Sequence, residues 1–233
     1  MKAFACSKLL AGINPAHHLN NIISAIKNGG GEALFVAGGL FCDHLFNDES
    51  YYSLYNAFSA LPDTGIFVCP GSDDPYMPDS PYLTRQWPAN VHIFNDRLKA
   101  FELASRQQDE PPVRVYGIAS VRHNPDICAF IPQKVPRTDR SFLNILLLSN
   151  LPEKDCGETI SAVLKNGTFD ALIYGMNRYC TDMQGAVAVP EAVVLDTTPV
   201  HEDCIIPFDT DKKATILSGT IGRGCVSFQT EVI

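Results

Sequence analysis

Paired cysteines are absent from this sequence, although cysteine itself is not rare. The eight cysteines are scattered, none belongs to a CxxC pair, and several lie inside apolar, strand-like runs. A zinc knuckle or a disulfide framework would place its cysteines in clusters. The pattern therefore argues against both of those classes and predicts reduced, mostly buried thiols.

Long apolar runs are absent as well. No stretch approaches the roughly 20 apolar residues that a membrane-spanning helix needs. The opening residues, MKAFACSKLL, lack the apolar core of a signal peptide and are soon followed by Gly12 and Pro15. We therefore expect a cytoplasmic protein with no membrane partner.

The sequence contains fewer basic than acidic residues. Lys and Arg total 18 against 26 Asp and Glu, which gives a formal charge of −8 at pH 7 and a pI near 5.1. This balance argues against a broad phosphate-binding face, so the composition does not support a nucleic-acid partner. Internal repeats, low-complexity segments and shifts in composition are also missing. The 233 residues, 45% of them hydrophobic, therefore predict a single domain over residues 1–233.

The sequence does contain a succession of short apolar runs separated by amphipathic segments. Helices are expected from Ala16 to Lys27, from Ser50 to Leu61 and from Ser161 to Lys165. Strands are expected at Lys2 to Cys6, Ala33 to Ala37, Gly65 to Cys69, Val91 to Phe94, Val113 to Ile118, Ser141 to Leu148 and Asp170 to Tyr174. Strands that alternate with helices predict β-α-β units and parallel pairing, whereas the strand-like tail from Val187 onward predicts antiparallel pairing.

The stretch GIFVCPGSDD, from Gly65 to Asp74, is the centre of the predicted chemistry. Its apolar strand runs into a turn at Pro70 and Gly71, and a pair of carboxylates follows. In open α/β sheets, ligands bind beyond the carboxyl ends of the strands. We therefore look for functional residues in the loops that follow the strands.

Five short motifs follow strands in order along the chain. They are SKLLAG (Ser7 to Gly12), GGLFCD (Gly38 to Asp43), GSDDP (Gly71 to Pro75), LLLSN (Leu146 to Asn150) and GMNR (Gly175 to Arg178). Their order, spacing and hydrophobic context resemble the calcineurin-like metallophosphoesterases, most closely the SbcD type of DNA-repair nuclease. The resemblance implies an α/β fold, the calcineurin-like metallophosphoesterase sandwich of two mixed β-sheets flanked by helices.

The chain differs from this family at nearly every position that the resemblance assigns to the metal site. The substituted positions are Lys8 for the first aspartate ligand, Leu10 for a histidine, Gly39 for the bridging aspartate, Ser72 for the asparagine ligand, Asp73 for the catalytic histidine, and Ser149, Met176 and Arg178 for three later histidines. Asp74, a supporting residue in the family, is kept. The resemblance therefore implies a degenerate site.

The physics of a two-metal site makes these substitutions important. Two divalent cations about 4 Å apart repel by roughly 17 kcal/mol at an effective dielectric near 20, so anionic and imidazole ligands must offset that repulsion. Gly39 offers no side-chain ligand atom, and Lys8 and Arg178 add positive charge. We therefore expect no catalytic residue and no cofactor.

The leading prediction is a catalytically inactive metallophosphoesterase-like protein. By resemblance, it is a structural or regulatory subunit in DNA repair or nucleic-acid metabolism. The expected partner is a protein, and an SbcC-like ATPase is the candidate that the resemblance implies. A homo-oligomer remains open.

Two alternatives remain open beside this prediction. Asp43, His44, Asp73 and Asp74 are predicted at one sheet edge and suggest a phosphoesterase or nuclease with a relocated metal ion, although Asp73 and Asp74 are also typical turn-capping residues. Lys8 and Arg178 suggest a phosphate- or nucleotide-binding module, although the same charges suit an internal ion network.

Overall fold

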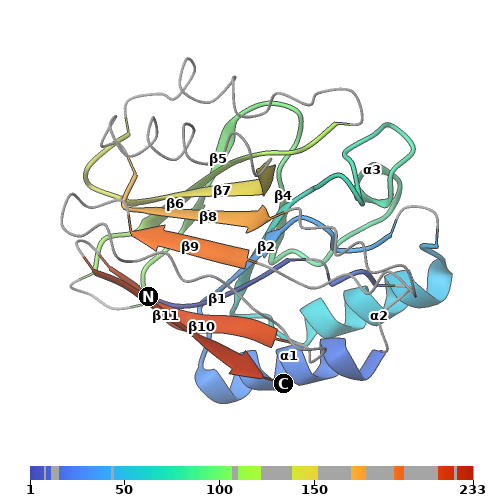
Figure 1. Ribbon diagram of the computed structural model, residues 1–233, viewed down its shortest axis with the longest axis horizontal. Helices are drawn as coiled ribbons and strands as arrows, with labels where there is room; N and C mark the ends of the chain where they lie inside the picture. The colour runs from blue at the N-terminus through green and yellow to red at the C-terminus, as the bar shows by residue number, and fades with distance from the viewer. Residues whose placement is uncertain are drawn as a thin grey trace.

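The computed structural model describes residues 1–7, 9–11, 16–42, 45–106, 110–121, 138–151, 169–176, 192–196, 215–222 and 225–232. Within them the protein is an α/β structure with two mixed β-sheets, one of six strands and one of five. Figure 1 shows the two sheets together with helices α1 and α2. The expectation of an α/β fold with two mixed sheets and flanking helices is therefore confirmed.

The six-stranded sheet has the strand order β11-β10-β1-β2-β3-β4. Its strands are β1 (Lys2–Cys6), β2 (Ala33–Ala37), β3 (Gly65–Cys69), β4 (Val91–Ile93), β10 (Thr215–Gly222) and β11 (Cys225–Val232). Strands β1 to β4 pair in parallel, as expected for strands joined by crossovers. The hairpin of β10 and β11 adds to β1 in the antiparallel direction, so β1 lies inside the sheet.

The five-stranded sheet has the strand order β5-β6-β7-β8-β9. Its strands are β5 (Lys99–Leu103), β6 (Val113–Ile118), β7 (Leu143–Leu151), β8 (Ala171–Met176) and β9 (Ala192–Asp196). The three central strands are parallel, and the two outer strands are antiparallel to their neighbours. The pairing of β7 with β8 shifts register between Leu148 and Leu151.

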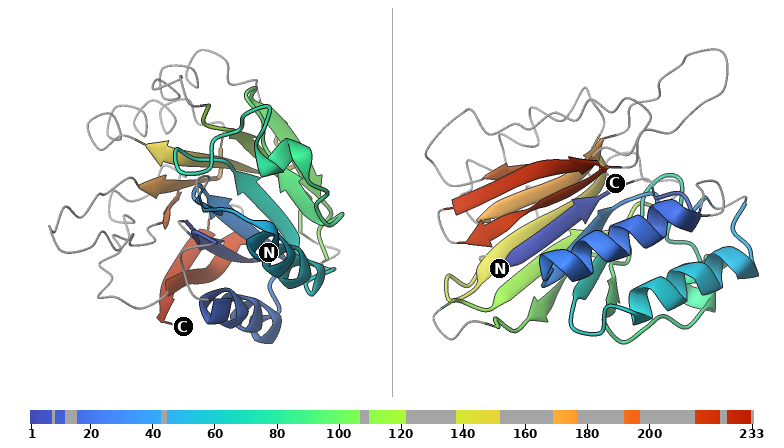
Figure 2. Two further views of the ribbon diagram at one scale, coloured as in Figure 1. Left: turned by 90° about the vertical axis from the view of Figure 1, so that its right-hand side faces the viewer. Right: turned by 90° about the horizontal axis from the view of Figure 1, so that it is seen from below.

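Helices α1 (Ala16–Gly29) and α2 (Asp48–Ser59) lie side by side against the first sheet, as Figure 2 shows. Helix α1 buries Leu19, Ile22, Ile23 and Ile26, which recur at three- and four-residue spacing. Helix α2 begins after Asn47, whose side chain accepts the Ser50 N–H at 2.9 Å. A third, short helix, α3 (Pro81–Thr84), lies in the segment between β3 and β4.

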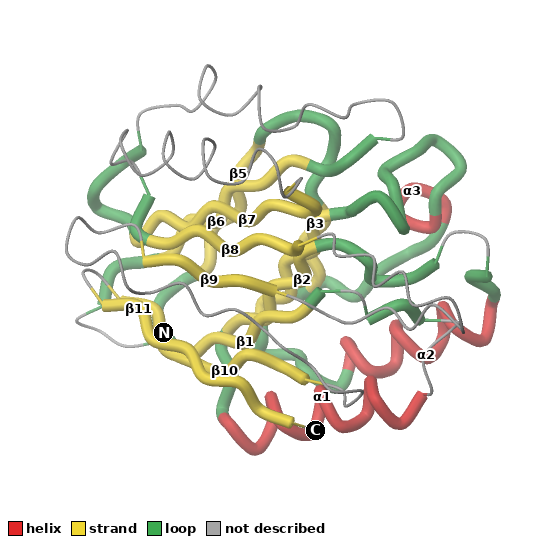
Figure 3. The backbone as a smooth tube through the Cα atoms, viewed as in Figure 1, coloured by secondary structure: helices red, strands yellow, loops and turns green. Residues whose placement is uncertain are grey.

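Two apolar cores lie on opposite faces of the six-stranded sheet. Between the sheets, Phe35 and Phe67 of the first sheet pack with Ile145, Leu147 and Ile173 of the second. On the other face, a separate cluster joins the outer side chains of the sheet to α1 and α2. Figure 3 shows the strands between which the first core lies. Burial of each such large apolar side chain stabilises the fold by about 1.5–3 kcal/mol.

An aromatic stack joins the two sheets near their outer strands. The His92 ring of β4 lies between Phe67 of β3 and Phe101 of β5, with ring-centroid distances of 5.1 and 4.9 Å. The Lys99 ammonium group lies 4.2 Å from the centroid of Phe101. Burial, and to a lesser degree the charge of Lys99, lower the pKa of His92. The stack therefore favours the neutral imidazole.

The strand predictions have the same bounds as the structure for β1, β2, β3 and β6. The strand β5 was not predicted, because KAFEL alternates half-buried and exposed residues and carries two charges. The helix expected from Ser50 to Leu61 begins and ends earlier, at Asp48–Ser59. The helix expected from Ser161 to Lys165 lies outside the described residues.

The thiols in the described part of the chain behave as structural side chains. Cys6, Cys42 and Cys69 are free, and burial raises the pKa of Cys6 and of Cys69 to about 12. These two thiols therefore stay protonated at neutral pH. In the same described residues, no helix is both long and apolar enough to cross a membrane.

Candidate functional site

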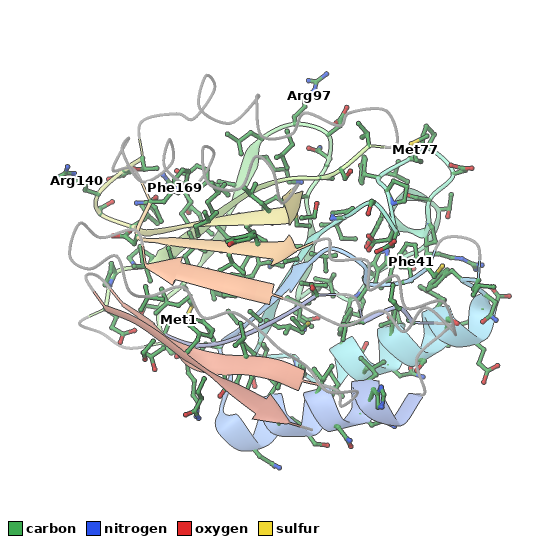
Figure 4. The ribbon with its side chains drawn as sticks, in the orientation of Figure 1. Met1, Phe41, Met77, Arg97, Arg140 and Phe169 are labelled. Carbon is green, nitrogen blue, oxygen red and sulfur yellow. The ribbon has the colours of Figure 1, made fainter. Side chains whose placement is uncertain are left out.

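The carboxyl ends of strands from both sheets meet at one end of the molecule. The Ser149 hydroxyl of β7 donates to the Pro70 carbonyl after β3 at 2.7 Å, and the Leu10 N–H after β1 donates to the Gly39 carbonyl after β2 at 2.9 Å. In Figure 4, Phe41 and Met77 lie toward this end and Met1 lies toward the other. The expected meeting of the loops therefore holds for the segments after β1, β2 and β3 and for the end of β7.

The two sheets approach each other closely at Gly175 in β8. A Cβ atom built at Gly175 would lie 2.1 Å from the carbonyl oxygen of Ala37 and 3.4 Å from the Cβ of Ser7. Contacts below 3.0 Å are essentially absent from real structures. The glycine therefore lets β8 approach the ends of β1 and β2.

The turn after β2 depends on two glycines in the left-handed region. Gly38 has φ of 86° and Gly39 has φ of 67°. A side chain strains the backbone at such φ values, whereas glycine adopts them freely. In this turn the N–H groups of Gly39 and Leu40 both donate to one acceptor, the carboxylate of Asp74. Successive N–H groups of this kind form a cradle for an anion.

The carboxylate of Asp74 is the hydrogen-bonding centre of this loop end. Its Oδ1 accepts the N–H of Gly39 at 2.9 Å and the N–H of Gly71 at 2.7 Å. Its Oδ2 accepts the N–H of Leu40 at 2.7 Å and the hydroxyl of Tyr82 at 2.6 Å. The side chain thereby ties together the turn after β2, the turn after β3 and helix α3.

Burial sets the electrostatics of this group. Asp74 is fully buried, which raises the pKa of its carboxyl group to about 6, and the hydrogen bonds from Tyr82, Gly39, Gly71 and Leu40 oppose the rise. Burial and the neighbouring carboxylate also raise the pKa of Tyr82 well above its usual value. At neutral pH the carboxylate of Asp74 is therefore ionised, and it accepts a hydrogen bond from the protonated hydroxyl of Tyr82.

These contacts define what Asp74 does in the protein. A carboxylate has about four lone-pair directions, and four donors already occupy them here. The residue is a structural anchor, and it has no oxygen available for a metal ion in this arrangement. That result weakens the relocated metal site, which included Asp74.

The other described candidate residues fall into a buried group and a surface group. Leu10 is 5% exposed and has φ of 46°, and Ser149 is fully buried with its hydroxyl directed at Pro70. Ser72 is exposed and Asp73 is half-exposed in the turn after β3. Asp73 is therefore the accessible carboxylate of the pair, whereas Asp74 is not.

The remaining candidates are Lys8, Asp43, His44 and Arg178, which lie outside the described residues, and Met176, of which only the strand backbone is described. The structure therefore gives no position for Lys8 and Arg178, the predicted anion-binding pair, or for Asp43 and His44 of the relocated metal site. Among the described residues, no group of three or more His, Cys, Asp or Glu side chains is arranged to hold a metal ion.

Sequence reasoning missed two parts of this site. Tyr82 lies eight residues after Asp74 and outside any motif, so no local pattern predicts their hydrogen bond. The donors from Gly39, Leu40 and Gly71 are backbone groups, which side-chain motifs do not report. The repeated glycine in GGLFCD was the available signal for a turn with positive φ.

Comparison with known proteins assigns neither a family nor a function to this chain. No protein-family model matches the chain, and no curated protein sequence matches it.

Proposed function

We propose that this chain is a catalytically inactive metallophosphoesterase-like protein of the SbcD nuclease type, which serves as a structural or regulatory subunit in DNA repair or nucleic-acid metabolism. The proposal includes the calcineurin-like sandwich as the specific fold. It is supported by the two mixed sheets and by the meeting of the segments after β1, β2 and β3 with the end of β7.

The observation that carries the proposal is the pairing of Gly39 with Asp74. The resemblance assigns the bridging carboxylate ligand to position 39, where this chain has a glycine at positive φ. The N–H of Gly39 donates to Asp74, so the carboxylate at this place comes from the neighbouring loop and accepts a hydrogen bond from the backbone. The turn is therefore built for internal hydrogen bonding.

A two-metal centre does not fit the described residues. Leu10 contributes a buried hydrocarbon side chain, Gly39 contributes none, and all four lone-pair directions of Asp74 are taken. The buried Ser149 hydroxyl is directed at a carbonyl group. With so few ligands, the repulsion between two divalent cations would not be offset.

A protein partner is supported by exposed aromatic and apolar side chains near α2 and α3. Tyr52 and Leu83 are 58% and 52% exposed, and the Tyr51 ring lies 5.1 Å from Tyr52 and 5.8 Å from Trp87. The Arg85 guanidinium lies 5.2 Å from the centroid of Tyr51. Tyr, Trp and Arg are the residue types that dominate binding energy at protein interfaces. An SbcC-like ATPase is the partner that the resemblance implies.

Metal content and phosphodiester hydrolysis test the proposal directly. The purified chain is incubated with Mn²⁺, Zn²⁺ and Fe²⁺ in excess, desalted and analysed by elemental mass spectrometry, and hydrolysis of bis(p-nitrophenyl) phosphate is then followed. We expect less than stoichiometric metal and no turnover above the metal-only blank.

The variants Asp73→Ala and Asp79→Ala make the test specific. Asp73 is the accessible carboxylate at the candidate site, whereas Asp79 is an exposed carboxylate of the same loop and serves as the control. Stoichiometric metal together with activity that Asp73→Ala abolishes and Asp79→Ala preserves would overturn the proposal and establish a rebuilt hydrolytic site.

A further inference from the structure

Strand β11 differs from the other outer strands of the two sheets. Strand β4 has three residues, β9 has five, and β5 has five that include Lys99 and Glu102. Strand β11 has eight residues, no proline, and Glu231 as its one charged residue. Proteins usually keep outer strands short, charged or interrupted by proline, because their unpaired N–H and C=O groups attract other strands. Strand β11 is long, lacks proline and has a single charged residue, next to its last position.

The hydrogen bonding of β11 is one-sided in the part of the chain that the structure describes. The strand pairs with β10 along its whole length, from Cys225 opposite Gly222 to Val232 opposite Thr215. It ends the order of the six-stranded sheet, and no described strand is hydrogen-bonded to its other side. Strand β9 of the second sheet approaches it without forming a ladder. Figure 1 shows the β10–β11 hairpin at the margin of the sheet, far from β4.

The side chains of β11 are suited to continuing the sheet. Val226 and Phe228 are half-buried and pack against the core between the sheets. Ser227 and Gln229 lie on the opposite face and are exposed. At these four residues a neighbouring strand would therefore find an apolar row, Val226 and Phe228, on one face and a polar row, Ser227 and Gln229, on the other.

We infer that β11 is a self-association surface, on which a second copy of this chain pairs antiparallel through its own β11. Two identical strands that pair antiparallel are related by a two-fold axis, so the contact closes on itself as a dimer. The two six-stranded sheets then become one continuous sheet. A second copy satisfies, through one self-complementary contact, the outer edge of β11 that has no hydrogen-bonded neighbour among the described strands of either molecule.

The pattern of residues selects a register centred on Phe228. In that register Phe228 lies opposite its own copy, Ser227 lies opposite Gln229, and Glu231 lies opposite Cys225. The two Glu231 positions are thereby kept apart, and like charges directly opposite each other would destabilise the pair. Aromatic pairs across strands contribute further stabilisation.

The expected association is weak. One pair of eight-residue strands buries less than the roughly 1,200 Å² that marks the lower limit of standard interfaces. We expect a dissociation constant on the order of tens of micromolar. This inference stands on the outer strand and is independent of the proposed function, so each can fail without the other.

Sedimentation equilibrium of the full chain under reducing conditions, from about 5 to about 500 µM, measures this association. The double variant Ser227→Lys/Gln229→Lys places lysines opposite lysines in the stated register, and we expect it to remain monomeric. Both side chains are exposed, so the fold is retained, which circular dichroism and thermal unfolding verify. The control Asn20→Lys/Asn21→Lys adds the same charge at exposed positions of α1 and is expected to dimerise like the wild type.

Charge complementation tests the register. Ser227→Glu/Gln229→Glu alone is expected to be monomeric, and its equimolar mixture with the double-lysine variant is expected to form heterodimers. A wild-type chain that stays monomeric at about 500 µM overturns the inference, as does a dimer that the double-lysine variant leaves unchanged. Monomeric variants whose mixture does not associate overturn the register centred on Phe228.

Discussion

The hydroxyl of Tyr82 donates to Oδ2 of Asp74 across 2.6 Å, and both side chains are buried. Replacing Tyr82 by Phe removes this donor and keeps the ring, which contacts Phe41 and Trp87. The buried carboxylate would then have three donors in place of four. We expect the free energy of unfolding to fall by about 1–3 kcal/mol, measured by urea denaturation at pH 7.

Tyr52→Phe is the matched control for this change. Tyr52 is 58% exposed, so loss of its hydroxyl is expected to alter the free energy of unfolding by less than about 0.5 kcal/mol. Equal stability of Tyr82→Phe and the wild type would contradict the anchoring role of the Tyr82–Asp74 pair.

Substitutions at Ser149 test whether the candidate site has room for a histidine, the residue type that the resemblance implies at this position. Ser149→Ala removes the bond to the Pro70 carbonyl, but that carbonyl keeps the Ser120 N–H at 2.8 Å. We therefore expect a loss of about 0.5–1.5 kcal/mol in the free energy of unfolding. Ser149→His restores the residue type that the resemblance implies, in a fully buried position, and is expected to cost more because the core is overpacked.

The second readout for Ser149→His is metal binding, measured by elemental mass spectrometry after loading with Mn²⁺. We expect no gain over the wild type, because Leu10 and Gly39 supply no ligand atom and Asp74 already accepts four hydrogen bonds, which leaves Asp73 as the accessible carboxylate among the described candidate positions. A variant that is as stable as the wild type and binds one equivalent of metal would show that the site still accommodates the ligand set.

Gly175 tests the close approach of the two sheets. Gly175→Ala places a Cβ 2.1 Å from the Ala37 carbonyl oxygen, so the backbone of β8 or β2 must shift. We expect a loss of at least about 2 kcal/mol in the free energy of unfolding. Gly65→Ala is the comparison, because its nearest contacts are 3.1 and 3.2 Å from the ends of the Phe67 and Leu103 side chains, which can move. Equal effects at the two positions would argue against a rigid contact at Gly175.

The half-buried His92 predicts a dependence of stability on pH. Its pKa in the folded protein lies below the usual value of 6.5, chiefly because of burial and secondarily because of Lys99. As the pH falls below about 6.5, the unfolded chain takes up a proton at this residue before the folded chain does. The contribution of His92 to stability is therefore present above that pH and is lost as the pH falls toward the folded-state pKa.

The variant His92→Phe isolates this effect, because it keeps an aromatic ring between Phe67 and Phe101. We expect the free energy of unfolding of the wild type to decline relative to that of His92→Phe between pH 7 and about pH 5, in parallel denaturant titrations. Parallel curves across this range would mean that His92 titrates alike in the folded and unfolded chains.

The parts of the fold that could be predicted are those that local pattern determines. Strands β1, β2 and β3 are short apolar runs, each closely followed by a polar or turn-forming residue, and their bounds follow from the sequence alone. Strand β5 was missed because its half-buried alternation includes Lys99 and Glu102, so it lacks an apolar run. The extension of β7 to Leu151 was missed because Ser149 and Asn150 read as the start of a loop.

The site was harder to predict because its central bonds join distant segments through the backbone. The sequence identified Gly39 and Asp74 as positions of interest, but it did not indicate that the N–H of one donates to the carboxylate of the other. That contact depends on two turns meeting across the sheet, 35 residues apart in the chain. The role of Tyr82 depends on the path of the loop that holds α3, which no short motif encodes.

The interior position of β1 affects how the protein can fold during its synthesis. Strand β1 pairs with β2 early in the chain, but its other neighbour, β10, begins only at Thr215. At typical translation rates, about 10 to 40 seconds separate the appearance of these two neighbours. During that interval the edge of β1 that later pairs with β10 lacks this partner, and an unpaired strand edge is a hazard for aggregation. A ribosome that stalls before Thr215 would therefore display a sheet that is open at β1, because the strand that pairs with this edge is made much later than β1.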